Sequence, residues 1–282
     1  MKKINFKKTL IIMILFFILF ISYMELKNTL RKIKMSQQKN KTVNMMKINN
    51  SNIITNPNSK EVINSNTPEN LDNKKPTLKC WKAIKRKDSY NNELQFYSKS
   101  NVIIEDNTIE ITSKKETKGS KLYTSGLVES TTAYKYGYFK FNIEISKGKG
   151  LFPAIWFLPN DGSSLPEVDL FEMIGSEPHI FYGVIHFTED DIQGSDHFKY
   201  KVPIKSQYSV ALSWDPTSIT WYIDDKEVYT SKKGVPNKYM YIIINQAIGG
   251  VWPGNPDNDT VFPNKFKVTS TSIKPLFKES RY

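Results

Sequence analysis

The sequence holds one cysteine, Cys80, among 282 residues. A single thiol excludes an internal disulfide, and we expect Cys80 to behave as a small, partly buried apolar residue. The three histidines, His179, His186 and His197, are scattered, and no cysteine–histidine pair has metal-ligand spacing. The sequence also lacks an internal repeat and a long helical period. These absences argue against disulfide scaffolds, zinc modules and helical arrays.

Positive charge is concentrated at the N-terminal end. The chain has a formal net charge of +12, from 40 Lys and Arg and 28 Asp and Glu. Residues 1–75 contain 14 basic and 4 acidic residues (net +10), which leaves 26 and 24 (net +2) for residues 76–282. The nearly neutral remainder argues against nucleic acid as a partner. The basic arm is typical of a membrane-proximal segment or of contact with anionic wall polymers.

Residues 1–24 have the pattern of an export signal. Basic residues (Lys2, Lys3, Lys7 and Lys8) precede an apolar run over residues 10–21, and no small-x-small cleavage site follows. About 15 apolar positions are few for a membrane span, which needs about 17–25. We expect an uncleaved signal anchor that places the protein at the cell surface. The alternative is a cleaved signal peptide and a secreted, extracellular protein.

Residues 25–77 are predicted to be a disordered linker. Asn, Lys, Ser and Thr dominate, and no aromatic residue occurs between Tyr23 and Trp81. Such a segment cannot bury enough apolar surface to offset the entropy of the chain. About 50 flexible residues span roughly 40 Å. The linker is therefore expected to tether a domain away from a membrane.

Residues 78–282 are predicted to form one all-β domain. Aromatic residues become dense, and short β-type runs alternate with turn residues. Residues 138–145 alternate Phe and Ile with polar side chains. About 200 residues are enough for the core of a sandwich of many short strands. Trp214 and Trp221 lie in strand-like runs and are expected in that core.

Residues 167–172, Glu-Val-Asp-Leu-Phe-Glu, are the most informative stretch. On a strand, Glu167 and Asp169 point to one face, and Glu172 joins them only if a β-bulge adds a residue. Acids in one cleft repel one another unless one is protonated and another ionised, as a retaining glycoside hydrolase requires. Taken alone, the stretch is equally consistent with an ordinary edge strand that has one solvated face.

Several stretches in chain order resemble glycoside hydrolase family 16. The acidic stretch is similar to the bulged Glu-x-Asp-x-x-Glu form found in its laminarinase-like β-1,3-glucanase branch. Residues 91–97 (NNELQFY), 123–126 (YTSG), 136–159 and 245–254 resemble other family segments. The resemblance covers about residues 81–275. It implies a jelly-roll β-sandwich with a substrate cleft across a concave sheet.

The resemblance also implies roles for the three carboxylates. Glu167 would be the nucleophile, Glu172 the general acid/base, and Asp169 would form a hydrogen bond with Glu167 and tune its ionisation. Glu172 must stay protonated near neutral pH, so burial or nearby negative charge must raise its pKa. Glu167 must be ionised to attack the anomeric carbon, and Glu172 would later deprotonate water.

Substrate contacts are expected from aromatic faces and from polar groups that bind hydroxyls. Trp156 and Trp252 match cleft positions of the family, with burial in the core as the alternative. His186 matches the cleft histidine of the family, with a purely structural role as the alternative. Further candidates for contacts with sugar hydroxyls are Asn92, Glu93 and Asn245.

Two departures from the family pattern lie away from the carboxylates. The usual opening strand is diverged, and Thr269 replaces an aspartate that often helps to bind structural calcium. No cofactor is required and no catalytic metal is expected; structural calcium is placed in doubt by the replacement.

The expected protein is a monomeric retaining endo-glycosidase that acts on β-linked polysaccharide, with β-1,3-glucan as the expected substrate. The membrane is an expected second partner, through residues 1–24. A transglycosylase would use the same covalent intermediate. A non-catalytic glycan-binding module would not need Glu167 and Glu172, which are both present. An anchored adhesin would tolerate Glu167→Gln.

Overall fold

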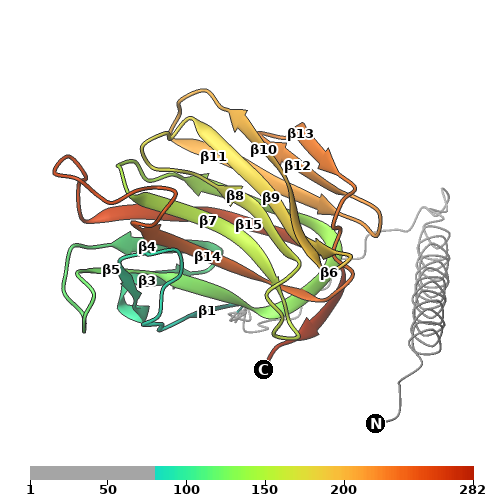
Figure 1. Cartoon of the computed structure of the whole chain (residues 1–282), viewed down its shortest axis with the longest axis horizontal. Helices are drawn as coiled ribbons and strands as arrows, with labels where there is room; N and C mark the ends of the chain where they lie inside the picture. The colour runs from blue at the N-terminus through green and yellow to red at the C-terminus, as the bar shows by residue number, and fades with distance from the viewer. Residues whose placement is uncertain (1–79) are drawn as a thin grey trace, which may run out of the picture. The chain divides into compact units, whose positions relative to one another are not determined.

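The computed structural model describes residues 80–282, which form an all-β sandwich, as predicted (Figure 1). The predicted signal anchor and linker lie outside the described residues. Within the described part, no helix has the length and apolarity needed to cross a membrane. The strands are β1 (Trp81–Ala83), β2 (Gln95–Tyr97), β3 (Val102–Glu105), β4 (Thr108–Ser113), β5 (Tyr123–Ser125), β6 (Leu127–Glu144), β7 (Leu151–Pro159), β8 (Glu167–Glu172), β9 (Ile180–Glu189), β10 (Ile192–Lys201), β11 (Gln207–Trp214), β12 (Ile219–Ile223), β13 (Lys226–Ser231), β14 (Met240–Ile248) and β15 (Asn264–Ser280), with a 3-10 turn η1 (Lys99–Asn101).

Strand β6 joins the two layers of the sandwich. It is 18 residues long. Its first half pairs with β14, its second half pairs with β11, and β15 runs along the other edge of the strand (Figure 1). The hydrogen-bonded order is β10-β9-β8-β7-β14-β6-β11-β12-β13, with β15, β4 and β3 continuing from β6. One layer therefore contains the consecutive strands β10-β9-β8-β7-β14. These strands include β8, which carries the acidic stretch, and its neighbours.

The strand passes between layers at Tyr136 and Gly137, which have positive φ values of 61° and 133°. At Gly137 a Cβ would lie 2.5 Å from the carbonyl oxygen of Lys274 on β15. Only glycine allows both this backbone conformation and this close approach. Residues 136–159 resemble a segment of the family, and the first two of them form the corner of the sandwich.

The core lies between the two layers. Phe139, Phe141 and Ile143 alternate with polar residues along β6 and are fully buried, which confirms the predicted alternation. Trp214 and Trp221 are 3% and 1% exposed, as expected for core residues. Trp221 also donates from Nε1 to the main-chain carbonyl of Asp169, at 3.0 Å. The core is therefore attached directly to the strand that carries the carboxylates.

Gly137→Ala is expected to lower the free energy of unfolding by about 2–4 kcal/mol, because the added Cβ would meet main-chain atoms and φ is unfavourable. Urea denaturation measures the effect. Gly119→Ala is the matched control: its φ is also positive, at 61°, but nothing lies within 4 Å of the added Cβ. The control should cost only about 1 kcal/mol. Equal losses in the two variants would contradict the proposed close approach.

Candidate active site

A β-bulge in β8 brings the three carboxylates to one face. Asp169 pairs with Trp156 of β7, whereas Phe171 pairs with the adjacent Ile155, so Leu170 is the extra residue. The pairing of β8 with β9 is irregular at the same place. The bulge that the parity of the sequence required is therefore confirmed.

The residues between the acids face the core. Val168, Leu170 and Phe171 are 2%, 3% and 1% exposed and belong to the main hydrophobic cluster. Glu167 and Glu172 are half-buried and line the cleft on the opposite face of the strand. This alternation excludes the interpretation as an ordinary edge strand, since β8 lies between β7 and β9.

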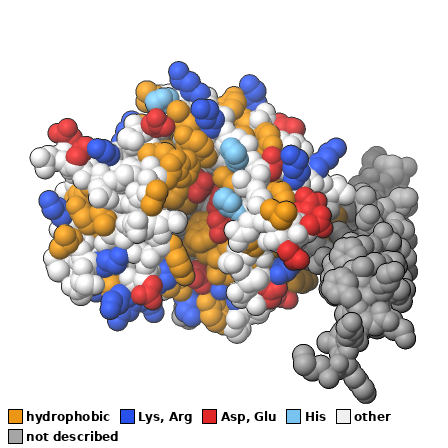
Figure 2. Space-filling model, viewed as in Figure 1, with side chains coloured by type: hydrophobic (Ala, Val, Ile, Leu, Met, Phe, Trp, Pro, Cys, Tyr) orange, Lys and Arg blue, Asp and Glu red, His pale blue; other side chains and the backbone are white. Residues whose placement is uncertain are grey.

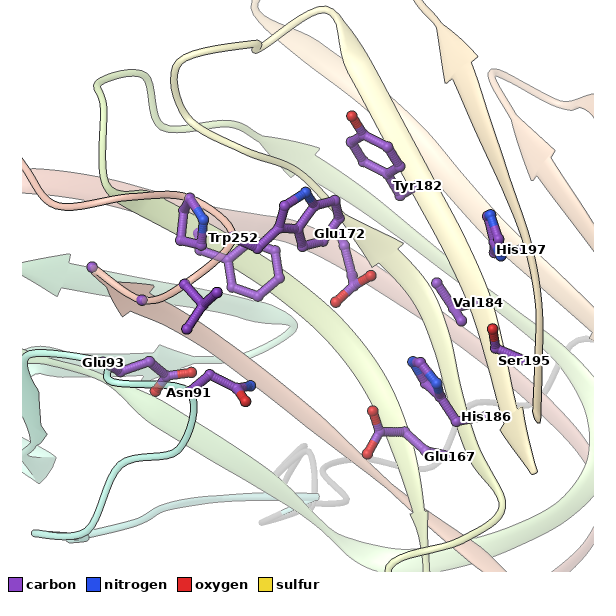
Figure 3. Close-up of a pocket in the computed structure, with 15 residues that line it drawn as sticks. Asn91, Glu93, Glu167, Glu172, Tyr182, Val184, His186, Ser195, His197 and Trp252 are labelled. Atoms are coloured by element: carbon purple, nitrogen blue, oxygen red, sulfur yellow. The ribbon is translucent and has the colours of Figure 1, made fainter. Parts of the chain in front are cut away.

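An open cleft extends to both sides of the carboxylates. Figure 2 shows a hollow with apolar and acidic side chains at its floor and histidine side chains on one margin. Toward β9 and β10, the cleft is lined by Tyr182, His186, Ser195, His197 and Trp252 (Figure 3). Toward β14 it is lined by Arg86, Tyr97, Trp156, Tyr241 and Asn245. Glu167, Glu172 and Glu93 border both parts.

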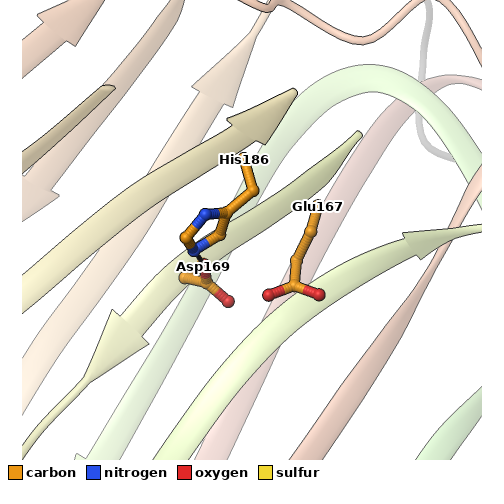
Figure 4. Close-up of side chains that lie close together, drawn as sticks. All are labelled: Glu167, Asp169 and His186. Carbon is orange, nitrogen blue, oxygen red and sulfur yellow. Dashed lines mark ion pairs between the residues drawn. The ribbon is translucent and has the colours of Figure 1, made fainter. Parts of the chain in front are cut away.

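Asp169 is the most buried of the three acids, at 3% exposed. Its Oδ2 atom lies 3.6 Å from Nε2 of His186 (Figure 4) and has no hydrogen-bond partner among the described residues. A buried carboxylate oxygen without a partner is costly. The structure does not form the predicted hydrogen bond between Asp169 and Glu167, although atoms of the two side chains lie within 4.8 Å of each other. The bond remains a prediction.

Burial raises the pKa values of all three acids. The pKa of Glu167 is raised to about 7 by burial, and that of Glu172 to about 8 by burial and by the charge of Glu167. The pKa of Asp169 is raised well above its ordinary value by burial, then by Glu172 and Glu167. The three acids cannot all be ionised at neutral pH, so the site retains a proton, as the expected role of Glu172 requires.

His186 lies in the cleft with its side chain 44% exposed, as the resemblance implied. Burial and then the nearby His197 lower its pKa. The imidazole is therefore neutral near pH 7 and provides a polar group beside Asp169 without adding positive charge.

Trp156 lines the cleft, and Asn245 fixes the orientation of its ring. The indole Nε1 of Trp156 donates to Oδ1 of Asn245, at 2.7 Å, while Nδ2 of Asn245 donates to the hydroxyl of Tyr97, at 2.9 Å. Asn245 is only 6% exposed. It was predicted to contact sugar hydroxyls; the structure shows its amide holding two cleft aromatics in place.

Trp252 forms an aromatic wall beside Glu172 (Figure 3). It is 47% exposed, and its ring packs edge-on against Tyr182, at 4.8 Å, and Phe152, at 5.4 Å, between centroids. Neither Trp252 nor the half-buried Trp156 belongs to the buried core, which was the alternative for both. Both line the cleft, in which the resemblance assigns them to substrate contact.

The segment around Asn92 differs from the expectation. Asn91 and Asn92 have φ values of 53° and 62° and form a tight turn, closed by the N–H of Glu93 donating to the carbonyl of Tyr90, at 2.9 Å. Asn91 and Glu93 line the cleft, but Asn92 is not among its lining residues. Successive residues of a tight turn point in different directions, and here Asn91 faces the cleft in place of Asn92. Contact with a sugar hydroxyl remains a prediction for Glu93.

His197 and Tyr182 are cleft residues that the sequence analysis missed. A signal was available in the two-residue turn Asp190-Asp191, whose φ values are 51° and 63°. Such a turn fixes the register of a hairpin. It pairs Glu189 with Ile192 and hence Val184 with His197, and this pairing brings His197 to the cleft face.

The described residues offer one group of donors close enough to hold a metal ion. Atoms of Glu167, Asp169 and His186 all lie within 4.8 Å of one another (Figure 4). The same three side chains are those to which the resemblance assigns the nucleophile, its neighbouring aspartate and the cleft histidine. At the position linked to structural calcium, the hydroxyl of Thr269 donates to the carbonyl of Asn142, at 3.3 Å. This position supplies no carboxylate to a calcium ion, and no step of the chemistry below depends on calcium.

Most glycoside hydrolases use a pair of Asp or Glu residues that face one substrate cleft, and this sandwich presents such a pair. The sequence pattern of the glycosyl hydrolases family 16 matches residues 90–269. The chain belongs to this family.

Curated relatives and solved structures agree with the family. The chain is 32% identical over 200 residues to the endo-1,3-1,4-beta-glycanase EglC of Rhizobium meliloti (strain 1021), covering 63% of this chain and 42% of that protein. It is 29% identical over 199 residues to the glucan endo-1,3-beta-glucosidase A1 of Niallia circulans, covering 58% and 29%. The endo-beta-1,3-glucanase structure from Pyrococcus furiosus has 27% identity and a TM-score of 0.61, covering 71% and 89%. The chain spans less than half the length of these curated relatives.

Glu172→Gln is expected to stabilise the protein at pH 8 by about 1–3 kcal/mol, because it removes a charge that burial and Glu167 disfavour. A raised folded-state pKa, about 8 against the ordinary 4.5, lowers stability as pH rises between these values. The advantage of the variant should therefore vanish below pH 4.5, where both states of the wild type are protonated.

Thermal unfolding from pH 4 to pH 8 measures this difference. The control is Glu105→Gln, which changes an exposed glutamate on β3. We expect it to be neutral at all pH values. An advantage of Glu172→Gln that did not depend on pH would show that the three acids do not share a proton.

Proposed function

We propose that this protein is a retaining endo-glycosidase that hydrolyses β-1,3-linked glucan by double displacement. The observation that carries the proposal is the bulge in β8, which places Glu167, Asp169 and Glu172 on one face of an open cleft. The raised pKa of Glu172 supports its role as a proton donor at neutral pH. Asp169, between the two glutamates, is the neighbour that modulates their ionisation.

In the first step, the ionised Glu167 attacks the anomeric carbon while Glu172 donates its proton to the glycosidic oxygen. The bond to the leaving sugar breaks, and a covalent glycosyl–Glu167 ester forms. In the second step, the now ionised Glu172 removes a proton from water, and the resulting nucleophile attacks the anomeric carbon. The ester breaks, Glu167 is released as a carboxylate, and Glu172 is protonated again.

Two features support an extended β-glucan as substrate. The cleft continues on both sides of the carboxylates, so a chain can bind without an end in the site. Trp156 lies on one side, and Trp252 with Tyr182 lies on the other, which offers aromatic surfaces for sugar rings on both sides of the cleaved bond. Of the proteins named above, one is an endo-β-1,3-glucanase by name, one is a glucan endo-1,3-β-glucosidase, and the third is an endo-1,3-1,4-β-glycanase.

An extracellular place of action is consistent with such a polymer. The export pattern of residues 1–24 supports this part of the proposal. Retention of this segment would keep the enzyme at the cell surface, and its cleavage would release the enzyme.

The purified protein is expected to release reducing ends from laminarin, with mixed-linkage glucan, agarose and carrageenan as comparison substrates. Glu167→Gln should lower the rate by about three orders of magnitude or more, because the amide cannot form the ester. NMR of the first-formed product should show the β-anomer. Glu105→Gln is the control for a change of charge outside the cleft.

An inverted first product would contradict the nucleophilic role of Glu167. Products longer than the substrate would show that a sugar hydroxyl replaces water in the second step. A folded protein that releases nothing from laminarin would contradict the proposed function.

A further inference from the structure

The chain beyond β15 returns to the cleft layer. Residues 270–282 lie past the end of the family match at residue 269. β15 runs along β6, and the N–H of Arg281 still donates to the carbonyl of Thr131, at 3.1 Å. The main chain therefore delivers Arg281 to the half of β6 that pairs with β14.

The side chain of Arg281 is held by contacts on several sides. Nη1 donates to the carbonyl of Ser130, at 2.8 Å, and to the carboxylate of Glu129, at 3.0 Å. Nε donates to Oδ1 of Asn160, at 3.2 Å. Only 13% of the side chain is exposed. This network fixes the plane of the guanidinium group and balances its charge with that of Glu129.

The guanidinium group covers a tyrosine of the cleft. Its carbon lies 3.5 Å from the centre of the Tyr241 ring. Tyr241 is half-buried and lines the part of the cleft toward β14. Arginine stacks on aromatic rings through its planar, weakly hydrated charge, a geometry that lysine does not reproduce. Arg281 therefore stacks on and restricts a ring that also lines the cleft.

Tyr241 lies in line with the carboxylates. β14 pairs Tyr241 with Leu158 and Ile243 with Trp156 of β7, and all four line the cleft. Trp156 pairs in turn with Asp169, and Phe157 pairs with Val168. The tyrosine therefore lies two strands away from β8, shifted two residues from the level of Asp169 toward that of Glu167. One sugar unit of a β-glucan bound at the acids can reach this ring.

Arg281 also restrains the segment that leads from β7 to Glu167. Asn160, its partner, begins the connection between β7 and β8, and Ser164 in that connection lines the cleft. Asn160 is further held by Glu279 of β15, at 2.9 Å. The C-terminal segment thus contacts β6, β14 and the connection that leads to Glu167.

We propose that Arg281 is a positioning residue that holds Tyr241 as an aromatic platform for one sugar unit at the β14 end of the cleft. The inference rests on the proposed function, since the ligand is the extended β-glucan. The chemistry at the anomeric carbon does not involve Arg281. Its contribution is to binding of longer chains.

The test is a kinetic comparison of laminarin and of laminari-oligosaccharides of increasing length. Arg281→Ala and Tyr241→Ala should each raise KM for the longer substrates about 5–20-fold, with kcat changed less than about twofold. The shortest substrate that is cleaved should be unaffected. The double variant should resemble the single variants, because each removes the same platform. Tyr241→Phe should retain the wild-type KM, since the ring and not the hydroxyl is used.

Two further variants separate positioning from charge and from folding. Arg281→Lys retains the charge but not the planar stack, so it should keep an elevated KM, and it replaces Arg281→Ala if that variant does not fold. Lys278→Ala removes a positive charge from an exposed position of β15 and should behave as the wild type.

The outcomes distinguish this inference from the proposed function. Laminarin cleavage by the wild type with an unchanged KM in the Arg281 variants would overturn the inference alone. Equal losses of kcat on short and long substrates, or effects of Arg281→Ala and Tyr241→Ala that multiply, would also overturn it. Failure of the wild type to cleave laminarin would overturn both.

Discussion

The site depends on one constraint: β8 must bury two consecutive apolar side chains. Leu170 and Phe171 are both nearly inaccessible to solvent, which regular alternation along a strand does not allow. Burial of such side chains contributes about 1.5–3 kcal/mol each, whereas an ionised carboxylate in the core costs far more. The bulge buries the apolar side chain and keeps the carboxylate out of the core, because it turns Phe171 inward and Glu172 outward. The acid–base group is thus a consequence of hydrophobic burial as well as of the acids themselves.

The surrounding sheet must hold the acids together against their repulsion. β8 is paired on both sides, with β7 and with β9, and the carbonyl of Asp169 receives the indole N–H of Trp221 from the other layer. None of these contacts neutralises the acids, since His186, 3.6 Å from Asp169, has a lowered pKa and is neutral near pH 7. The fold therefore tolerates locally unfavourable electrostatics in order to keep a proton in the cleft.

Features of the site that follow from local pattern could be predicted from the sequence. The parity of Glu167, Asp169 and Glu172 required the bulge, and the apolar alternation of β6 identified one side of the core. Features that depend on contacts between distant strands could not be predicted in this way. Asn245 and Trp156 are 89 residues apart, and Arg281 meets Ser130 across 151 residues. No periodicity within a strand encodes such pairings, so the orienting roles of Asn245 and Arg281 emerge only from the fold.

The same physical device serves two places in the cleft. An aromatic ring gives strong but weakly directional contacts, and a polar partner can fix its orientation in addition to packing. Asn245 fixes Trp156 through a hydrogen bond to the indole, and Arg281 stacks on Tyr241 from a network anchored on β6. Rings that are already oriented lose less entropy when a ligand binds. These orienting groups are on β14 and beyond β15, whereas the acids are on β8. The preference for one polysaccharide over another can therefore change without disturbing the acids. This separation gives a physical reason why one fold hosts many polysaccharide specificities.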